Sequence, residues 1–393
     1  MVSLTPTPPA NAFVTAADLD REQPRFPLDV FFCDGCAHVQ LLDVVDPRAL
    51  FENYVYVSGT SPTFVRHFEG YSCDMIARAN LGPGDLVVDI GSNDGTLLRF
   101  FAEAGCRTLG IDPARDIARR ATEAGIETIA GVISVELARR IRDERGPAAL
   151  VTANNVFAHV DDLTEFVAAA RTLLAPDGLF AFEVSYLADM VEKVLFDTIY
   201  HEHLDYHSVK PLRRFFAMHG MELIEVIRVD AHGGSIRGVA QLAGGGCAAG
   251  RSVESMIALE ERLGLDRGET FFRFAERIDA LKDALSSVLG DLKTEGKRIA
   301  GYGAPAKATT LMYHFDLGPE IIDFIVDDSP FKQGLYSPGL HVPVLPPEAI
   351  YERRPDCLLV LAWNFAEPIM SKHRDYAEAG GRFIVPAPTI EIY

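Results

Sequence analysis

The pattern of apolar and polar positions changes several times along the chain. Residues 1–25 show no clear period, and apolar and polar residues then alternate from Phe26 to Leu42 around a Cys33-Asp-Gly-Cys36 turn, which predicts a small strand-turn-strand module. Between 85 and 185 short apolar runs alternate with segments of helical period, and the same alternation returns after residue 298. A long helical pattern over 252–295 separates these two regions.

Each region of alternation predicts a parallel sheet with helices on both faces. The expected strands of the first region are Leu86 to Ile90, Thr108 to Ile111, Thr128 to Ala130, Leu150 to Ala153 and Leu179 to Glu183, and Glu222 to Val229 follows later. The expected strands of the second are Arg298 to Gly301, Ile321 to Val326, Cys357 to Leu361 and Phe383 to Pro386.

The length of the chain agrees with more than one domain, because a single hydrophobic core seldom organises more than roughly 250–300 residues and this chain has 393. We predict an α/β protein with three parts. Residues 1–62 form a small Cys-pair module resembling a zinc ribbon, residues 63–247 a cofactor-binding Rossmann-like domain, and residues 248–393 a second Rossmann-like domain.

The composition narrows the class of protein. A formal net charge of −19 disfavours a nucleic-acid partner, because phosphate backbones are repelled and the sequence has no strongly basic stripe. No stretch approaches the roughly 18 apolar residues of a membrane span, and the N-terminus lacks the pattern of a secretion signal. We expect a cytoplasmic protein without a membrane partner.

The glycine-bearing turn after the first expected strand predicts a cofactor site. Gly91 and Gly95 allow a close approach to a ligand, and Asp112 ends the second strand, where a carboxylate can accept both ribose hydroxyls of an adenosine. The three-glycine spacing of a dinucleotide site is missing. An acidic loop with Asp89 and Asp94 suits the cationic S-adenosylmethionine better than a dinucleotide, although a plain strand-turn-helix remains the alternative.

Three further segments concentrate polar and aromatic residues: Asn154-Asn-Val-Phe-Ala-His-Val160, Tyr200-His-Glu-His-Leu-Asp-Tyr206 and His232-Gly-Gly-Ser-Ile-Arg237. With Gly301-Tyr-Gly-Ala-Pro-Ala-Lys307, Lys332-Gln-Gly334 and Leu361-Ala-Trp-Asn364, they make the chain resemble the deoxysugar 3-C-methyltransferases of antibiotic pathways. The resemblance extends from about Asn11 to the C-terminus. Members of that family methylate C3 of a nucleotide-linked 4-keto-6-deoxysugar, here expected to be linked to TDP.

The resemblance implies roles for many of these residues. His203 would be the base that removes the C3 proton, Glu202 and Tyr200 would shape its environment, and His159 and Tyr54 would line the sugar pocket. The cofactor would be bound by Asp89, Gly91, Asn93, Gly95, Asp112, Asn154 and Asn155. The nucleotide-sugar would be bound by Tyr56, Ser58, His201, Ser235, Arg237, Tyr302 and Lys307, with Ser235, Arg237 and Lys307 at the diphosphate.

The His-Glu-His run also has less specific interpretations. A solvated helix face is the commoner use of such residues, and part of a metal site is another. The two histidines are two positions apart, whereas the helical zinc-protease pattern requires four. The resemblance favours a catalytic role, but it leaves open whether His203 or Glu202 takes the proton.

Cys33 and Cys36 have the spacing of one half of a zinc site. In the resembling family a second Cys pair lies upstream, whereas this sequence has no Cys or His before residue 33. A structural zinc requires four ligands, so we do not expect a tightly held zinc here.

Two other functions fit parts of the pattern. The loop at 301–307 follows a predicted strand and can bind a phosphate, so a nicotinamide-dependent 4-ketoreductase is the first alternative, even as a second activity of the same chain. The third glycine of a dinucleotide-binding loop is missing from residues 301–307. A non-catalytic scaffold built on the Cys33/Cys36 ribbon is the second, and it leaves the His and Tyr clusters unexplained.

Overall fold

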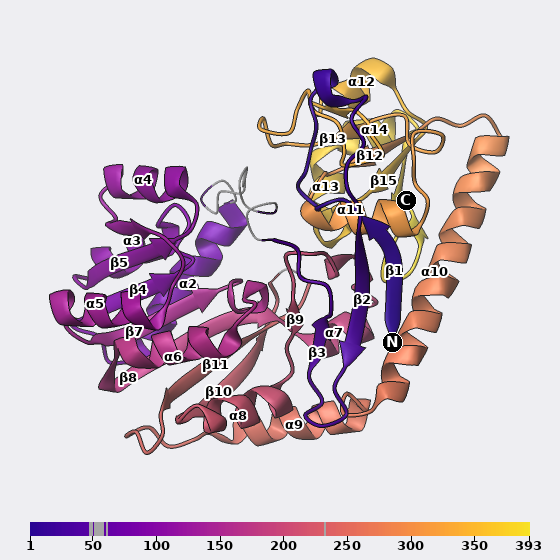
Figure 1. The fold of residues 1–393 in the computed structure, drawn as a ribbon. Coiled ribbons are helices and arrows are strands. Elements are labelled where there is room, and N and C mark those ends of the chain that lie inside the picture. The colour runs from indigo at the N-terminus through magenta and orange to yellow at the C-terminus, as the bar shows by residue number, and fades with distance from the viewer. Residues whose placement is uncertain (47–49, 51–58, 60–61, 232) are drawn as a thin grey trace.

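The computed structural model describes residues 1–46, 50, 59, 62–231 and 233–393. These residues form three sheets, which lie in distinct parts of the molecule (Figure 1). The largest sheet and its helices make up one half, a second parallel sheet lies at the top of the other half, and the N-terminal strands run between them beside the long helix α10, Gly268–Thr294. The predicted α/β architecture is confirmed.

The largest sheet has seven strands in the order β10-β11-β8-β7-β4-β5-β6. Five are mutually parallel: β4 (Leu86–Ile90), β5 (Arg107–Asp112), β6 (Thr128–Ala130), β7 (Ala148–Asn154) and β8 (Leu174–Ser185). The other two, β10 (Met221–Val229) and β11 (Ser235–Leu242), extend the sheet as antiparallel strands. Every strand predicted for this region is present. The sequence does not predict β11, near whose start lie Ser235 and Arg237, two residues that are expected at the diphosphate.

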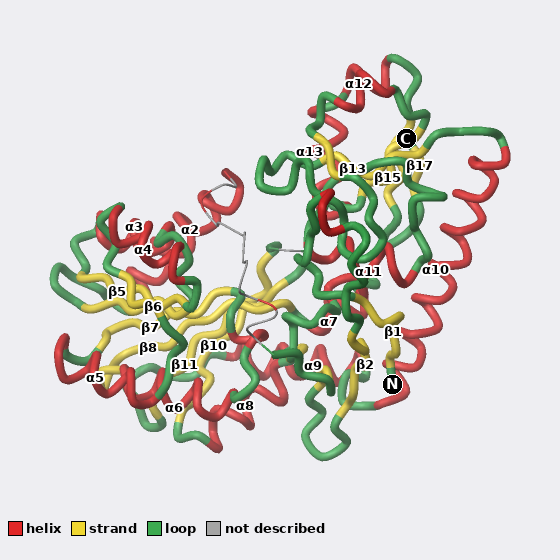
Figure 2. Tube along the Cα trace, turned by 45° about the horizontal axis from the view of Figure 1, so that its top comes forward, coloured by secondary structure: helices red, strands yellow, loops and turns green. Residues whose placement is uncertain are grey.

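Helices cover both faces of this sheet (Figure 2). Alternate residues of β4 explain why: Val87 packs with α2 and α3, whereas Val88 belongs to the core that includes α5 and α6. The helices of this half are α2 (Pro62–Arg78), α3 (Thr96–Glu103), α4 (Arg115–Glu123), α5 (Val135–Arg145), α6 (Leu163–Leu173), α7 (Leu187–Glu192) and α8 (Val209–Met218), with short 3-10 turns η3 (Phe157–His159) and η4 (Phe196–Thr198).

The C-terminal sheet has the order β14-β13-β12-β15-β16-β17. Its strands are β12 (Ile299–Tyr302), β13 (Ile325–Val326), β14 (Val344–Leu345), β15 (Cys357–Val360), β16 (Arg382–Val385) and β17 (Glu391–Ile392), parallel except for β17. Around it lie α11 (Ala306–His314), α12 (Ala349–Arg353), η5 (Trp363–Phe365), α13 (Ala366–Lys372) and α14 (Arg374–Glu378). The four strands expected here are present with shifted ends.

The long helical pattern before this sheet is two helices. The chain forms α9 (Arg251–Leu263), changes direction after Gly264 and continues as α10 (Figure 1). Gly264 has φ +72, a left-handed conformation that favours glycine and ends a helix. A period of 3.6 continues through such a break, so the pattern alone does not locate it.

The N-terminal strands form an antiparallel sheet in the order β1-β2-β3-β9. These are β1 (Val2–Thr7), β2 (Phe26–Phe32), β3 (Val39–Leu41) and β9 (Asp205–Tyr206). The connection from β1 to β2 contains a 3-10 turn, η1 (Ala16–Asp18). The predicted strand-turn-strand around the Cys pair is confirmed as β2 and β3, whereas β1 was not anticipated. β1 also packs on α11, where the Thr5 backbone N lies 3.2 Å from Nδ1 of His314. This sheet therefore connects both larger halves.

Candidate functional site

The turn between β4 and α3, residues 91–95 (the cofactor turn), is fixed in shape by close contacts with neighbouring residues. Gly91 has φ +74, and a Cβ there would lie 2.2 Å from a methyl carbon of Val156, so only glycine fits. The Asp112 carboxylate accepts hydrogen bonds from the backbone N–H groups of Asn93 and Ala114, both at 2.8 Å. Asp112 thereby links the carboxyl ends of two adjacent strands, which is the edge where open α/β sheets bind ligands.

Two polar groups beside this turn are buried. The Asp89 carboxylate accepts a hydrogen bond from the Thr152 hydroxyl at 2.6 Å, and burial, followed by repulsion from Asp112, raises its pKa to about 7. The side-chain amide of Asn154 is buried and has no hydrogen-bond partner among the described residues. A buried polar group without a partner is costly, so a ligand that pairs with Asn154 would relieve that cost.

The other predicted cofactor residues surround the same edge. Gly95 has φ +76 and precedes the first turn of α3, where a Cβ would lie 2.9 Å from the Ile126 side chain. Asn155 has φ +56 and its backbone N–H donates to the Glu183 carbonyl at 2.8 Å. The predicted cofactor residues are therefore grouped at one edge of the sheet, as their positions after consecutive strands require.

His203, Tyr200 and His159 come together as an aromatic cluster. Nδ1 of His203 donates to the carbonyl of Thr198 at 2.7 Å, because a carbonyl can only accept. In the neutral ring Nε2 is then the acceptor, and the Tyr200 hydroxyl donates to it at 2.9 Å. The His159 ring meets the His203 ring edge-on with centroids 4.9 Å apart, and burial lowers the pKa of His159 well below its ordinary value.

Glu202 and His201 have partners outside that cluster. The Glu202 carboxylate accepts from the Asn11 side chain at 2.8 Å, and burial raises its pKa to about 7. Lys332 lies near enough to counteract that shift. His201 is fully buried, and its Nε2 faces the Phe26 carbonyl at 3.2 Å. These contacts do not support the expectation that His201 binds the nucleotide-sugar, because its ring is covered by the N-terminal module.

Arg237 and Ser235 are not open to a diphosphate. Arg237 is 7% exposed and its guanidinium bonds two carboxylates, Glu183 at 2.7 Å and Asp74 at 2.8 Å. The Ser235 hydroxyl is buried and donates to the Ala231 carbonyl at 3.0 Å. Since the charge of Arg237 is already compensated, we no longer assign either residue to the diphosphate.

Lys307 and Tyr302 are likewise engaged inside the protein. Nζ of Lys307 lies 3.4 Å from the Asp197 carboxylate, and burial lowers the pKa of this lysine. The Tyr302 hydroxyl lies 3.0 Å from Nε2 of His373, and burial raises its pKa. Direct contact of Lys307 with a diphosphate, which the sequence suggested, would require Nζ to leave Asp197.

The C-terminal sheet repeats the backbone anchor of the cofactor turn. The Asp327 carboxylate accepts from the N–H of Ala304, in the turn after β12, at 2.6 Å, and from that of Ser329, two residues on, at 2.8 Å. Gly303 has φ +88 and donates to the carbonyl that precedes Asp327. Asp112 makes the corresponding contacts around Gly91, so both sheets present a carboxylate-anchored turn at a carboxyl edge.

The Cys pair does not complete a metal site within the described residues. Cys33 is exposed and Cys36 is half-buried, and the nearby His38 is engaged by Asp205 at 2.6 Å. Across the described ranges, no group of three or more His, Cys, Asp or Glu side chains is arranged to hold a metal ion. The described residues do not fit a four-ligand zinc.

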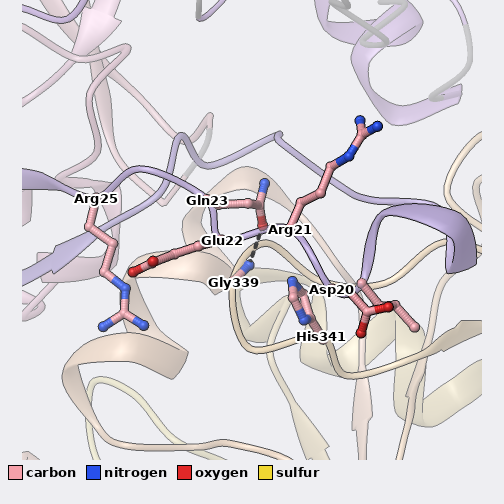
Figure 3. Close-up of a pocket in the computed structure, with 8 residues that line it drawn as sticks. Asp20, Arg21, Glu22, Gln23, Arg25, Gly339 and His341 are labelled. Carbon is pink, nitrogen blue, oxygen red and sulfur yellow. Dashed lines mark hydrogen bonds between the residues drawn. The ribbon is translucent and has the colours of Figure 1, made fainter.

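The remaining predicted site residues, Tyr54, Tyr56 and Ser58, lie outside the described residues. A surface cavity of about 250 Å³ lies between the Leu19–Arg25 segment and the loop with Gly339, whose N–H donates to Gln23 at 2.6 Å (Figure 3). Its described lining mixes acidic and basic side chains and contains none of the predicted site residues.

Sequence reasoning missed several residues that organise the site. Asn11 and Lys332 face Glu202, and Asp197 faces Lys307. The buried Glu183, a partner of Arg237, also pairs with the partly exposed His67 at 2.7 Å. Glu183 ends a predicted strand and Asp197 is three residues from Tyr200, so an acidic residue beside a motif was an available signal. Their partners are far away in sequence and were not predictable.

Comparison with known proteins gives matches along the whole chain. Residues 1–51 match the family described as "Putative zinc binding domain", residues 64–226 "Methyltransferase domain" and residues 230–388 "C-methyltransferase C-terminal domain". The C-methyltransferase NovU of Streptomyces niveus is 37% identical over 99% of this chain and 92% of its own. A ubiquinone biosynthesis O-methyltransferase of Burkholderia pseudomallei is 28% identical over 40% of this chain and 72% of its own.

Two solved structures are similar over about half of the chain. The PH0226 protein of Pyrococcus horikoshii has a TM-score of 0.40 at 15% identity, covering 49% of this chain and 97% of its own. Magnesium protoporphyrin IX methyltransferase of Synechocystis with bound SAM has a TM-score of 0.35 at 16% identity, covering 46% and 79%. The full-length match to NovU is the finding that excludes a non-catalytic scaffold and confirms the resemblance. The chain belongs to the S-adenosylmethionine-dependent C-methyltransferase family that its motifs indicated.

Proposed function

We propose that this enzyme methylates C3 of a nucleotide-linked 4-keto-6-deoxysugar, with TDP as the nucleotide, in a deoxysugar branch of antibiotic biosynthesis. A carbon beside a ketone becomes nucleophilic only when it loses a proton, so the site requires a base near that carbon and donors for the enolate oxygen. The observation that carries the proposal is the His203 ring, held with Nδ1–H on a carbonyl and Nε2 against the Tyr200 hydroxyl.

We assign the base to His203 rather than Glu202. His203 clusters with Tyr200 and with His159, the last residue of η3, which comes after β7 at the edge where the cofactor turn lies, whereas Glu202 bonds Asn11. The carbonyl bond at Nδ1 fixes the tautomer and leaves Nε2 to accept a proton, in the manner of an oriented catalytic imidazole. Tyr200 must then yield its place at Nε2 or pass a proton to it.

The reaction would be completed at the cofactor turn. When bound, S-adenosylmethionine would supply an electrophilic methyl group on a sulfonium centre. Asp89, Asp112 and Asn154 would hold it at the carboxyl edge. The electron pair of the broken C3–H bond would form the new C3–CH3 bond, the pair of the S–CH3 bond would go to sulfur, and S-adenosylhomocysteine would leave. Alignment of the two reactants is then the main contribution of the protein scaffold.

The third domain would hold the nucleotide. The turn anchored by Asp327 offers a cradle comparable to that of the cofactor turn, at a carboxyl edge where ligands of open α/β sheets bind. Arg237 and Lys307 are engaged elsewhere, and the N–H groups of Gly303, Ala304 and Ser329 are already bonded within the protein. The diphosphate would therefore meet the backbone N–H groups at the start of α11, which follows this turn.

The test has two stages. The enzyme is incubated with S-adenosylmethionine and a panel of TDP-linked 4-keto-6-deoxysugars, and a product heavier by one methyl group is expected for at least one sugar. Deuterium incorporation at C3 is then measured in heavy water with S-adenosylhomocysteine bound. We expect exchange in the wild type and in Glu202→Gln, and its loss in His203→Asn.

The control for the histidine change is His219→Asn, at the end of α8, which packs on Phe215 and lies outside the cluster. It should exchange as the wild type does. Full turnover by His203→Asn would refute the assigned base, and full turnover by Glu202→Gln as well would refute any role of this pair in the chemistry. The absence of methyl transfer to every sugar of the panel would refute the substrate class.

A further inference from the structure

A short turn between α7 and the His203 cluster lies against the C-terminal domain. This turn, Phe196–Ile199, includes η4 and ends one residue before Tyr200. Thr198 supplies the carbonyl that accepts Nδ1–H of His203 at 2.7 Å. The orientation of the ring therefore depends on where the backbone of this turn is held.

The three other residues of the turn are all bound by the C-terminal domain. The Phe196 ring stacks on Phe315 with centroids 4.8 Å apart, and the Ile199 carbonyl accepts from the Thr310 hydroxyl at 2.7 Å. Asp197 is 1% exposed, and the partners of its carboxylate come from this domain. Residues more than 100 positions away thus bind the neighbours of Thr198, whose carbonyl accepts the His203 Nδ1–H.

Asp197 receives both partners on a single oxygen. The Trp363 indole N–H donates to Oδ2 at 2.6 Å, and Nζ of Lys307 lies 3.4 Å from the same atom. Nζ also sits 3.9 Å from the centroid of the Trp363 ring, which favours a cation at that place. A buried carboxylate requires such partners to remain charged, so these two side chains determine where Asp197 and its neighbours can lie.

We propose that Lys307 and Trp363 are positioning residues for His203: they fix the Phe196–Ile199 turn from the C-terminal domain and so set the orientation and tautomer of the ring. The inference rests on the proposed function for its catalytic meaning. The C-terminal domain, which would bind the nucleotide, then has a second role. The orientation of the proposed base depends on how that domain packs against the Phe196–Ile199 turn.

The structural prediction is tested without any sugar. The full chain is labelled with ¹⁵N-histidine, and the His203 signals are assigned by their absence in His203→Asn. We expect the wild-type spectrum to show a neutral ring protonated at Nδ1. In Lys307→Met and, to a smaller extent, in Trp363→Phe, the ring should show a mixture of tautomers, because Asp197 loses a partner and the backbone at the Thr198 carbonyl is held less firmly.

The matched control is Lys282→Met, which removes a lysine of the same domain that pairs with Asp316 at 2.7 Å and does not contact the turn. Its His203 signals should stay as in the wild type. If Lys307→Met does not fold, Trp363→Phe carries the test, since it keeps an aromatic ring and removes one N–H. A folded variant with unchanged His203 signals would overturn the proposal.

Turnover provides the second measurement. With the sugar identified by the panel, Lys307→Met should lower kcat by roughly 10- to 100-fold, the size expected for a misplaced catalytic group, with the KM for S-adenosylmethionine within about twofold. A rise of that KM with unchanged kcat would contradict the positioning role. Full activity of His203→Asn would instead refute the proposed base, while the histidine spectra would still decide whether Lys307 orients the ring.

Discussion

Asp89 should make donor binding depend on pH in the neutral range. Burial and the neighbouring Asp112 raise its pKa to about 7 in the unliganded protein, so about a tenth of the molecules carry an ionised Asp89 at pH 6 and most do at pH 8. The sulfonium and amino group of S-adenosylmethionine are cationic. A nearby cation favours the ionised carboxylate and lowers its pKa by roughly 1–3 units.

The affinity for the donor should rise with pH. Donor binding must expel the proton from Asp89 at low pH, so affinity rises with pH and levels off above the pKa of the free protein. If the bound cation lowers the pKa to about 5, the Kd at pH 6 should be about tenfold that at pH 8, which corresponds to about 1.4 kcal/mol. S-Adenosylhomocysteine lacks the sulfonium charge and should show a shallower dependence.

Isothermal titration calorimetry at pH 6, 7 and 8 measures this effect. Asp89→Asn should remove the pH dependence, because an amide does not titrate, and Asp116→Asn, which changes an exposed aspartate on α4, should preserve it. A Kd that is flat between pH 6 and 8 in the wild type, or a slope that persists in Asp89→Asn, would refute the reasoning.

Three other changes have defined outcomes. Gly91→Ala should cost about 1–3 kcal/mol of stability in urea unfolding and weaken donor binding, because φ is +74 and the new Cβ meets Val156; unaltered stability would contradict the close contact. Glu260→Ala should cost about 3 kcal/mol in the same assay, because its carboxylate accepts two backbone N–H groups at the start of α8 and a tyrosine hydroxyl; a loss below about 1 kcal/mol would show that water replaces it. Replacing Cys33 and Cys36 together by serine should leave the Tm unchanged with or without a chelator, and metal analysis should find no stoichiometric zinc; one zinc per wild-type chain would contradict this.

The parts of the fold that the sequence predicted are those determined locally. The run Leu86–Ile90 is apolar except for Asp89 and is buried on both faces, so its strand and the following glycine turn could be located from the chain alone. The cofactor residues then follow, because carboxyl ends of neighbouring parallel strands share one edge. The resemblance to a known family added the grouping of His203 with Tyr200 and His159.

The roles that could not be predicted depend on distant partners. The positive charge of Arg237 suggests a diphosphate ligand, but Glu183 and Asp74 neutralise that charge, and Asp74 is 163 positions away. The positive charge of Lys307 suggests a phosphate ligand as well, but Asp197 holds it. A polar side chain shows its chemistry in the sequence, but its availability depends on contacts that only the folded chain brings together.

The N-terminal sheet has a consequence for the synthesis of the protein. Its strand β3 pairs with β9, and Thr5 of β1 meets His314, which the ribosome adds 309 residues later. At an elongation rate of roughly 5–20 residues per second, β1 is synthesised about 15–60 s before the part of the chain that packs on it. An uncovered strand edge can pair with other chains. We therefore expect this module to complete its folding last, although it is made first, and to be the part of the nascent chain that most needs protection by chaperones.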